Sequence, residues 1–263
     1  MNPRPTLDIA VSTYKPEGIE RVEKMILPPI EGVRWVVSWQ EHENAAIPLS
    51  LLSRNDISIN RLNSKGLSNN RNNSIRCCRA DIILISDDDM QYSVEGIKEI
   101  IKIFKLNPDI DLAIFKIDFS KKKSYPTSDC ELRLPLPKGY YASSVDLAFR
   151  RHKAADLSFN VNLGLGAPEM HCGEDEMFLF SAIKKGLRCC FFNILIGRHE
   201  GASTGSCVNP GILKGQGYVI QNYYPFTGWL RAIMKSIKIN KTDGYPIHKS
   251  LRYLFTGILR ALH

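Results

Sequence analysis

Short segments in which apolar and polar residues alternate recur along this chain and predict strands with one buried face. The first is residues 7–12, where Leu7, Ile9 and Val11 alternate with smaller or polar residues. Other segments show the same period of two, or a short continuous apolar run bounded by turn residues. The predicted strands are residues 7–12, 33–38, 57–62, 81–86, 113–119 and 188–196.

Helical spacing appears between these strands. Ile97, Ile100, Ile101 and Phe104 follow the i, i+3, i+4, i+7 pattern of an amphipathic helix that ends near Asn107-Pro108. Further helices are predicted over residues 67–79 and 175–185, the second closed by Gly186. Strands that alternate with helices predict an α/β fold with a mostly parallel central sheet flanked by helices. Such sheets bind ligands at the carboxyl ends of their strands.

The acidic triplet Asp87-Asp88-Asp89 directly follows the apolar strand 82–86. A buried strand cannot hold three unpaired carboxylates, so we expect the triplet where the strand emerges into a cleft. Side chains alternate along an extended chain, which places Asp87 and Asp89 on one side and Asp88 on the other. Two carboxylates at this spacing suit a divalent cation that keeps positions open for water or a phosphate-bearing substrate. A solvated acidic turn is the simpler alternative.

Composition favours a soluble, cytoplasmic protein. The longest apolar stretches, residues 82–85 and 189–196, are far shorter than the ~20 residues that cross a bilayer. The first residues lack the apolar core of a secretory signal. The seven cysteines show no C-x-x-C spacing, so neither a zinc knuckle nor a redox pair is indicated.

The C-terminal segment differs from the rest of the chain in charge. Residues 211–263 contain eight Lys and Arg against one Asp, which is +7 of the formal +8 of the whole chain. Glycines and a proline predict a linker over residues 205–217, followed by two short amphipathic helices. We therefore divide the chain into a domain of residues 1–205 and a basic helical extension of residues 206–263.

Aromatic and basic residues are interleaved in the basic extension, which favours peripheral contact with the anionic inner face of the cell membrane. No nucleic-acid module is present, so no nucleic-acid partner is expected. A solvated face on a helical cap is the alternative, and the oligomeric state stays open.

Four motifs occur in an order that resembles the family 2 glycosyltransferases of GT-A fold. Residues 66–72 read Gly-x-x-x-x-Arg-Asn before the strand that ends in the triplet, which stands at the D-x-D position. Residues 173–179 resemble the acidic acceptor-side motif, and Arg198-His199-Glu200 follows the next strand. Residues 11–14 resemble the first nucleotide-binding strand. Each motif alone is weak, but all four in this order form a specific signal.

The resemblance implies an inverting, metal-dependent, hexosyltransferase-like enzyme. Its donor would be a nucleotide sugar, UDP-linked by preference, and its acceptor a hydroxyl of a glycan or lipid-linked glycan in bacterial surface polysaccharide synthesis. Asp89 would bind Mn²⁺ or Mg²⁺, and Asp87 would reach the donor ribose or a metal-bound water. His199 stands where some GT-A enzymes have a third metal ligand. A histidine that only packs near a strand end is the alternative.

The acceptor hydroxyl must lose its proton as it attacks the anomeric carbon. Asp175 is the predicted base, because the first turn of a helix keeps a carboxylate ionised. Glu174 is the rival for this role, and Glu176 a lesser one. Arg71 is expected to pair with the diphosphate or contact the base, and Asp88 to orient the strand end or touch the sugar.

The nucleotide is expected to lie against the first two strands, with Thr13 and Tyr14 lining the base. Family 2 enzymes commonly have an Asp-rich turn after the second strand, where this chain has Gln40. The amide of Gln40 is expected to hydrogen-bond a pyrimidine, and the nucleotide identity stays open. A non-catalytic GT-A-like protein that binds a carbohydrate or nucleotide is the alternative function. A phosphatase with an Asp-x-Asp nucleophile is disfavoured, because its acidic pair would follow the first strand.

Overall fold

The computed structural model describes residues 5–119, 123–200 and 208–262 of the chain. These residues form two compact units. The first unit contains Met1–Lys65, Asn69–Ser158 and Ser181–Ala202, and the second contains Gly66–Ser68, Phe159–Phe180 and Ser203–His263. The boundary expected between residues 205 and 206 lies outside the described residues.

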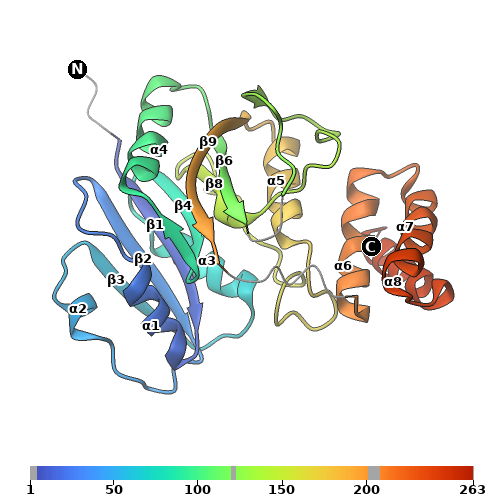
Figure 1. Cartoon of the computed structure of the whole chain (residues 1–263), viewed down its shortest axis with the longest axis horizontal. Helices are drawn as coiled ribbons and strands as arrows, with labels where there is room; N and C mark the ends of the chain where they lie inside the picture. Colours follow the sequence, from blue (N-terminus) through green and yellow to red (C-terminus); the bar gives the residue numbers. More distant parts are fainter. Residues whose placement is uncertain (1–4, 120–122, 201–207, 263) are drawn as a thin grey trace. The chain divides into compact units, whose positions relative to one another are not determined.

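Within the described residues, the first unit is built on one nine-stranded sheet (Figure 1). Its spatial order is β3-β2-β1-β4-β8-β6-β9-β5, and β7 pairs with β9. The strands are β1 (Leu7–Tyr14), β2 (Val33–Gln40), β3 (Ile57–Leu62), β4 (Ile82–Asp87), β5 (Met90–Tyr92), β6 (Leu112–Phe119), β7 (Cys130–Glu131), β8 (Leu147–Arg150) and β9 (Cys189–His199).

The predicted parallel arrangement is confirmed for β3-β2-β1-β4, and β6 is also parallel to β9. The sheet is mixed beyond β4, because β8 runs antiparallel to both β4 and β6, and β5 and β7 run antiparallel to β9. The pattern of the sequence did not reveal β5, β7 and β8. These strands have three, two and four residues, too few for a period of two to stand out.

Helices cover both faces of the parallel strands. Helices α1 (Pro16–Met25), α2 (Leu49–Leu52) and α4 (Val94–Leu106) bury apolar side chains against one face, in a core that includes Ile9 and Leu84. Helix α3 (Leu67–Cys77) lies on the other face, where Asn73 donates a hydrogen bond to Ser38 at 2.8 Å. This layering of helices around a central sheet is the α/β fold that the sequence predicts.

Helix α1 is an element that the sequence analysis missed. Strand β1 ends at Tyr14, and Pro16 occupies the start of α1, where its fixed φ and missing N–H suit the first helical turn. Lys15 makes the sharp change of direction with φ 63°, in the left-handed region that non-glycine residues rarely adopt.

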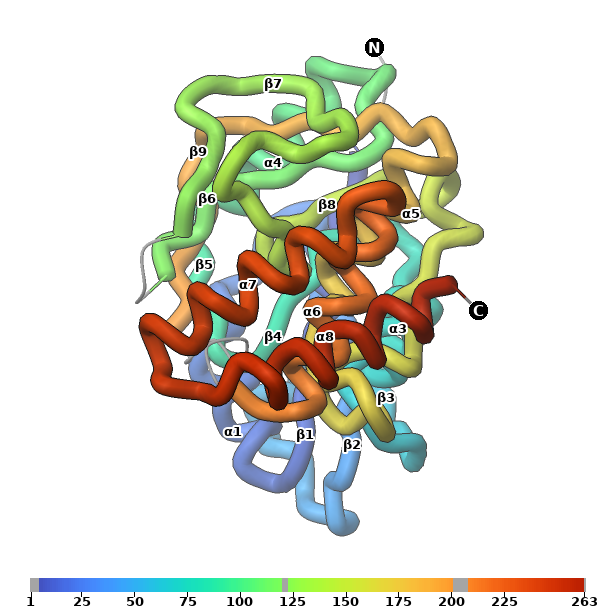
Figure 2. Tube along the Cα trace, turned by 90° about the vertical axis from the view of Figure 1, so that its right-hand side faces the viewer, coloured from blue at the N-terminus to red at the C-terminus, as the bar shows by residue number. Residues whose placement is uncertain are grey.

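The second unit contains helices α6 (Pro210–Tyr223), α7 (Gly228–Asp243) and α8 (Ile247–Leu262), which lie beside one another in Figure 2. A small core joins them, formed by Leu213, Ala232, Ile239, Leu254 and Ile258. The two helices predicted in the extension are confirmed as α7 and α8. In the part of the chain that the structure describes, no helix has the length and apolar character needed to cross a membrane.

The linker predicted over residues 205–217 is wrong from residue 210 onward, because that segment begins α6. Asn209 caps the helix by accepting the N–H of Ile212 at 3.0 Å, and Pro210 starts it. The glycines serve packing: a Cβ atom on Gly217 would lie 2.0 Å from the carbonyl oxygen of Leu254 in α8. A glycine-rich segment therefore marks close contact between helices here, and residues 205–207 lie outside the described range.

Candidate functional site

The acidic triplet lies at the carboxyl edge of the parallel strands, as the sequence predicts. Asp87 is the last residue of β4, and it pairs in register with Ser12 of β1, which in turn pairs with Ser38 of β2. Asp88 and Asp89 form the turn into β5. The ends of β1, β2 and β4 thus bring the triplet beside Thr13.

Asp87 is held by Arg71 of helix α3. The guanidinium Nη2 lies 2.9 Å from Oδ2 and 3.2 Å from Oδ1 of the carboxylate. The helix that carries Arg71 is fixed by its asparagines, since Asn70 donates to the carbonyl of Thr13 at 2.8 Å. The asparagines of residues 67–77 therefore hold α3 against the ends of the strands through hydrogen bonds.

Asp88 points to a different set of partners. Arg21 of α1 donates two hydrogen bonds to its carboxylate, from Nε to Oδ1 at 3.0 Å and from Nη2 to Oδ2 at 2.9 Å. The hydroxyl of Thr13 also donates to Oδ2. Burial raises the pKa of Asp88, while the bonds from Arg21 and Thr13 oppose the rise. Arg21 and Thr13 thus hold the Asp88 carboxylate at the end of the strand, and Arg21 is a partner that the sequence analysis did not single out.

Asp89 faces His199 because of the short β5–β9 ladder. Met90 pairs with His199, and the N–H of Glu200 donates to the carbonyl of Asp89 at 3.2 Å. The side chains meet with 3.3 Å between Asp89 Oδ1 and His199 Nε2. Burial raises the pKa of Asp89. The charge of His199 lowers this pKa, and the neighbouring charge of Asp87 raises it further.

The Asp89–His199 pair presents two side chains of the kind that bind divalent cations. Across residues 5–119, 123–200 and 208–262, no group of three or more His, Cys, Asp and Glu side chains is arranged to hold a metal ion. The pair offers one hard oxygen and one imidazole nitrogen, and Asp87 is engaged by Arg71. These donors fit a divalent cation that takes its remaining ligands from water or a phosphate group.

The ends of β1 and β2 form the wall beside the triplet. Tyr14 is exposed and Gln40 is buried, and the carbonyl of Gln40 accepts the N–H of Lys15 at 2.8 Å. The indole N–H of Trp39 donates to the carbonyl of Lys15 at 2.7 Å. Positive φ angles follow both strand ends, at Lys15 and at Glu41, Glu43 and Asn44. Non-glycine residues in this region indicate stored backbone strain, which clusters at functional sites.

Glu174 and Asp175 belong to the second unit, where they start helix α5 (Glu174–Lys184). Glu174 is buried against Gly164, where a Cβ atom would lie 2.9 Å from the Glu174 carboxyl carbon. Asp175 and Glu176 are more accessible than Glu174. Of the two main candidates for the base, the more exposed one is therefore Asp175.

Helix α6 packs directly on the segment that leads into this acidic motif. A Cβ atom on Gly211 would lie 2.2 Å from His171 Nδ1, and one on Gly215 would lie 2.4 Å from the carbonyl oxygen of Cys172. Cys172 also donates its thiol to the carbonyl of Ile212 at 3.3 Å. The first C-terminal helix is thus in backbone contact with residues 171–172, a relationship that the sequence analysis missed.

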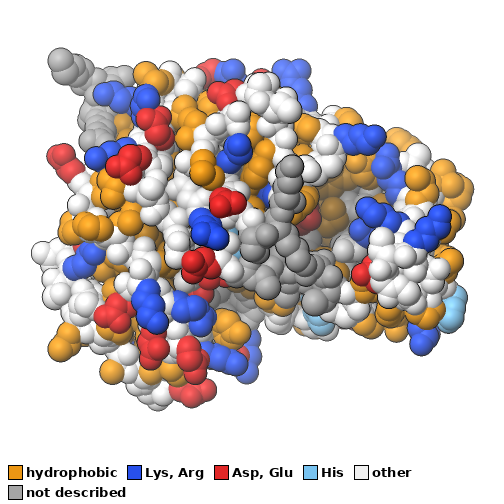
Figure 3. All heavy atoms as spheres, in the orientation of Figure 1, with side chains coloured by type: hydrophobic (Ala, Val, Ile, Leu, Met, Phe, Trp, Pro, Cys, Tyr) orange, Lys and Arg blue, Asp and Glu red, His pale blue; other side chains and the backbone are white. Residues whose placement is uncertain are grey.

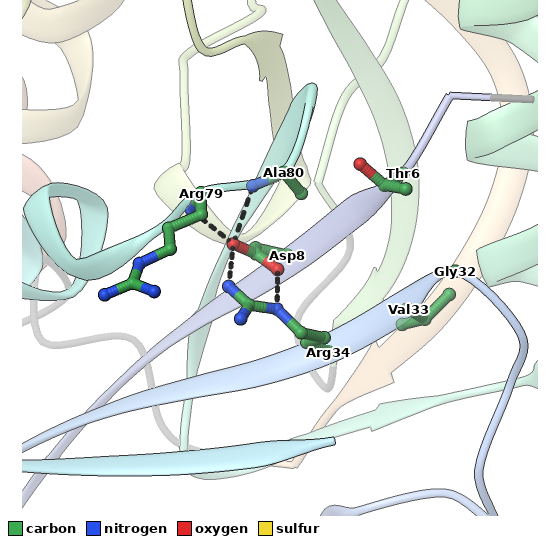
Figure 4. A pocket seen from close by; sticks show the side chains of 7 residues that line it. All are labelled: Thr6, Asp8, Gly32, Val33, Arg34, Arg79 and Ala80. Atoms are coloured by element: carbon green, nitrogen blue, oxygen red, sulfur yellow. Dashed lines mark hydrogen bonds and ion pairs between the residues drawn. The ribbon is translucent and has the colours of Figure 1, made fainter. Parts of the chain in front are cut away.

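A pocket at the opposite, amino end of the parallel strands contains the buried Asp8 (Figure 4). Arg34 binds its carboxylate at 2.9 and 2.8 Å, and the backbone N–H groups of Arg79 and Ala80 donate to it at 2.6 and 2.9 Å. Four hydrogen bonds saturate this carboxylate. Asp8 therefore fixes the start of β4 to β1 and β2, and its role is structural.

The triplet, Arg71 and His199 thus meet at one edge of the first unit. The sequence was compared with models of known families, and the Glycosyl transferase family 2 model matches residues 44–162. The chain is similar to glycosyl transferase family 2 over this segment, which is 119 of its 263 residues. It is a glycosyltransferase, and the matched segment holds Arg71 and all three residues of the triplet. Thr13, Tyr14, Gln40, Glu174, Asp175 and His199 lie outside it.

Solved structures of S. aureus TarS share the fold of this chain. The 1–349 fragment in complex with UDP aligns with TM-score 0.65 and 15% identity, covering 98% of this chain and 81% of the fragment. The same fragment in complex with UDP-GlcNAc aligns with TM-score 0.60 and 17% identity over 91% of this chain and 74% of the fragment. At this identity the likeness establishes the GT-A fold. No curated protein matches the chain.

Proposed function

We propose that this glycosyltransferase moves a sugar from a UDP-linked donor to a glycan hydroxyl, with inversion at the anomeric carbon. The convergence of Asp89 and His199, 3.3 Å apart at the carboxyl edge of the sheet, carries the proposal. The TarS structures support it, because they have UDP and UDP-GlcNAc bound to a protein of the same fold. A lipid-linked glycan and a role in surface polysaccharide synthesis are the setting that we infer from the family. A cytoplasmic location stays a prediction.

Asp89 and His199 are the residues that would hold Mn²⁺ or Mg²⁺, with the donor diphosphate and water completing the coordination. Bound there, the cation supplies positive charge to the departing diphosphate. The raised pKa of Asp89 supports this assignment, since a buried carboxylate among other acids gains from a nearby positive charge. Asp87 is oriented by Arg71 and is left to contact the donor ribose or a metal-bound water.

The donor base would lie against the ends of β1 and β2. Tyr14 is exposed there and offers a ring face to a base, while Thr13 is engaged by Asp88 and shapes the wall. Gln40 is buried, so its amide would reach a pyrimidine only from inside this wall. Arg71 is turned toward Asp87, and this ion pair supports a role for Arg71 in holding the donor side of the site in place.

Asp175 is the proposed general base. It lies in the first turn of α5, where the helix dipole favours a charged carboxylate, and it is more accessible than Glu174. Glu174 is packed against Gly164 and would hold the loop around residues 163–170. Exchange of Asp175 for Asn should retain donor binding and lose transfer, whereas Glu174→Gln should lower stability first.

Donor binding and donor turnover, measured separately, test the proposed function. Nucleotide sugars are screened by thermal shift with Mn²⁺ and Mg²⁺, and release of UDP is then followed for those that bind. We expect a UDP-sugar to bind with either cation and to be turned over, and Asp89→Asn to lose cation-dependent binding. Binding of a UDP-sugar without turnover by any acceptor would favour the non-catalytic alternative. Undiminished turnover by Asp89→Asn would overturn the metal assignment.

A further inference from the structure

Helix α7 has apolar side chains on two opposite faces. Its inner face packs in the core of the helical bundle through Ala232 and Ile239. The opposite face carries Leu230, Met234 and Ile237, which are 44%, 70% and 41% exposed. Their spacing of i, i+4, i+7 puts them in one stripe along the helix. The solvent side of a helix in a globular protein is normally polar, so this stripe is unexplained by the fold of the second unit.

Cations accompany the apolar stripe. Lys241 continues it by one further turn, and Arg231 and Lys238 lie along one of its sides by helical spacing. Arg231 is stacked on the ring of Tyr224, with its guanidinium carbon 3.5 Å from the ring centre. Figure 3 shows hydrophobic side chains beside Lys and Arg over the C-terminal helices. We call this surface the α7 face; it consists of Leu230, Arg231, Met234, Ile237, Lys238 and Lys241.

We propose that the α7 face binds the surface of an anionic membrane. The apolar stripe would enter the boundary between headgroups and acyl chains, and the flanking cations would contact lipid phosphates. Phe226 and Trp229, both exposed just before or at the start of α7, add aromatic rings of the kind that favour this boundary. An α7 of 16 residues is long enough to lie along such a surface.

Charge favours a lipid surface over a second copy of the chain. A two-fold interface would bring the α7 face against itself, and Arg231, Lys238 and Lys241 would then approach their own copies. Asp243 is the one acidic residue in positions 211–263, so the segment has almost no carboxylate to neutralise these cations. An anionic membrane supplies the missing negative charge and covers the apolar stripe at the same time.

Vesicle binding tests the proposal without any donor or acceptor, so its outcome is independent of the transfer reaction. The full chain is sedimented with vesicles of phosphatidylcholine alone, or of equal parts of phosphatidylcholine and phosphatidylglycerol. We expect binding to the anionic vesicles, little binding to the neutral ones, and a fall in binding as salt is raised.

Two variants separate the apolar and charged contributions. The triple exchange Leu230→Ser, Met234→Ser and Ile237→Ser should lower partition at least about tenfold. Lys238→Gln with Lys241→Gln should lower it about 25-fold, since one cation near an anionic surface contributes about 1 kcal/mol, or roughly fivefold. All five side chains are solvent-facing, so circular dichroism should show an unchanged fold.

A matched control uses exposed leucines elsewhere in the chain. Leu49 and Leu52 of α2 are 82% and 59% exposed, and their joint exchange for Ser should leave vesicle binding unchanged. Failure of the wild-type chain to bind anionic vesicles would overturn the proposal, as would an equal loss in the α2 control. Self-association in analytical ultracentrifugation that the triple Ser variant abolishes would assign the α7 face to a second copy instead.

Discussion

Asp89 and His199 face each other across the β5–β9 ladder, with 3.3 Å between carboxylate oxygen Oδ1 and imidazole Nε2. Two residues that are 110 positions apart in sequence are thereby fixed side by side at the end of the sheet. The pair stands next to two further carboxylates, whose charges add to the effect of burial on Asp89. The ionised form of Asp89 is therefore disfavoured by burial and by its two acidic neighbours, and favoured by His199.

The first prediction concerns stability, pH and divalent cations. Because the folded pKa of Asp89 is raised, its contribution to stability is complete at acid pH and is lost as pH rises through that pKa. At neutral pH, Asp89→Asn should raise the melting temperature of the cation-free chain by about 2–4 °C, the change that corresponds to roughly 1 kcal/mol in a domain of this size. Thermal unfolding at pH 5 and pH 7.5 measures the difference.

The same thermal unfolding experiment is then repeated in the presence of a divalent cation. Mn²⁺ should stabilise the wild-type chain more at pH 7.5 than at pH 5, because the raised pKa of Asp89 makes its ionised fraction larger at the higher pH. Asp89→Asn and His199→Ala should both reduce this cation effect. A wild-type chain whose melting temperature does not respond to Mn²⁺, with or without UDP, would contradict the role of the pair.

The second prediction compares the two arginine–aspartate pairs of the triplet. The side chain of Arg71 is 3% exposed and that of Arg21 is 41% exposed. Buried charge pairs lose more when one partner is removed, because water cannot replace it. Double-mutant cycles by urea unfolding should give a coupling energy for Arg71–Asp87 that exceeds the Arg21–Asp88 value by about 1 kcal/mol or more. Equal couplings would show that solvent reaches Arg71.

The position of the triplet was predictable, but the partners of its residues were not. A continuous apolar run followed by three acids specifies a strand end on local grounds. Arg21 reaches Asp88 from a helix 67 positions earlier in the chain, and no local pattern encodes that approach. The β5 strand that sets Asp89 opposite His199 has three residues, so its pairing depends on tertiary structure.

Glycine was the residue type whose structural role was hardest to predict from the sequence. The same glycines that predict a flexible linker also permit two backbones to touch, and composition cannot separate these cases. In α6 the second case holds, since Gly211, Gly215 and Gly217 all face neighbouring backbone or ring atoms. Asn209 at the N-cap and Pro210 in the first turn are local sequence features that favour a helix at this position.

The third prediction separates Asp88 from Asp89. Asp88 is bound by Arg21 and Thr13, so Asp88→Asn should lower the melting temperature while leaving transfer within about tenfold of wild type. Asp89→Asn should instead lower transfer by about a hundredfold or more without destabilising the chain. Activity is expressed per folded molecule, measured by circular dichroism. A loss of transfer in Asp88→Asn equal to that in Asp89→Asn would place Asp88 against the donor.

The last prediction tests whether α6 positions the acidic motif. Gly215→Ala and Gly217→Ala lie two residues apart in one helix, and their new Cβ atoms would meet carbonyl oxygens at 2.4 Å and 2.0 Å. Alanine at an open helical position would stabilise by up to about 1 kcal/mol, so a loss of stability in both variants would confirm these contacts.

Only Gly215 faces Cys172, three residues before Asp175, whereas Gly217 faces Leu254 of α8. Gly215→Ala should therefore lower kcat with little change in the KM for the donor, and Gly217→Ala should retain kcat per folded molecule. If both variants lowered kcat alike at equal stability, α6 would support the fold of the second unit without specifically positioning Asp175.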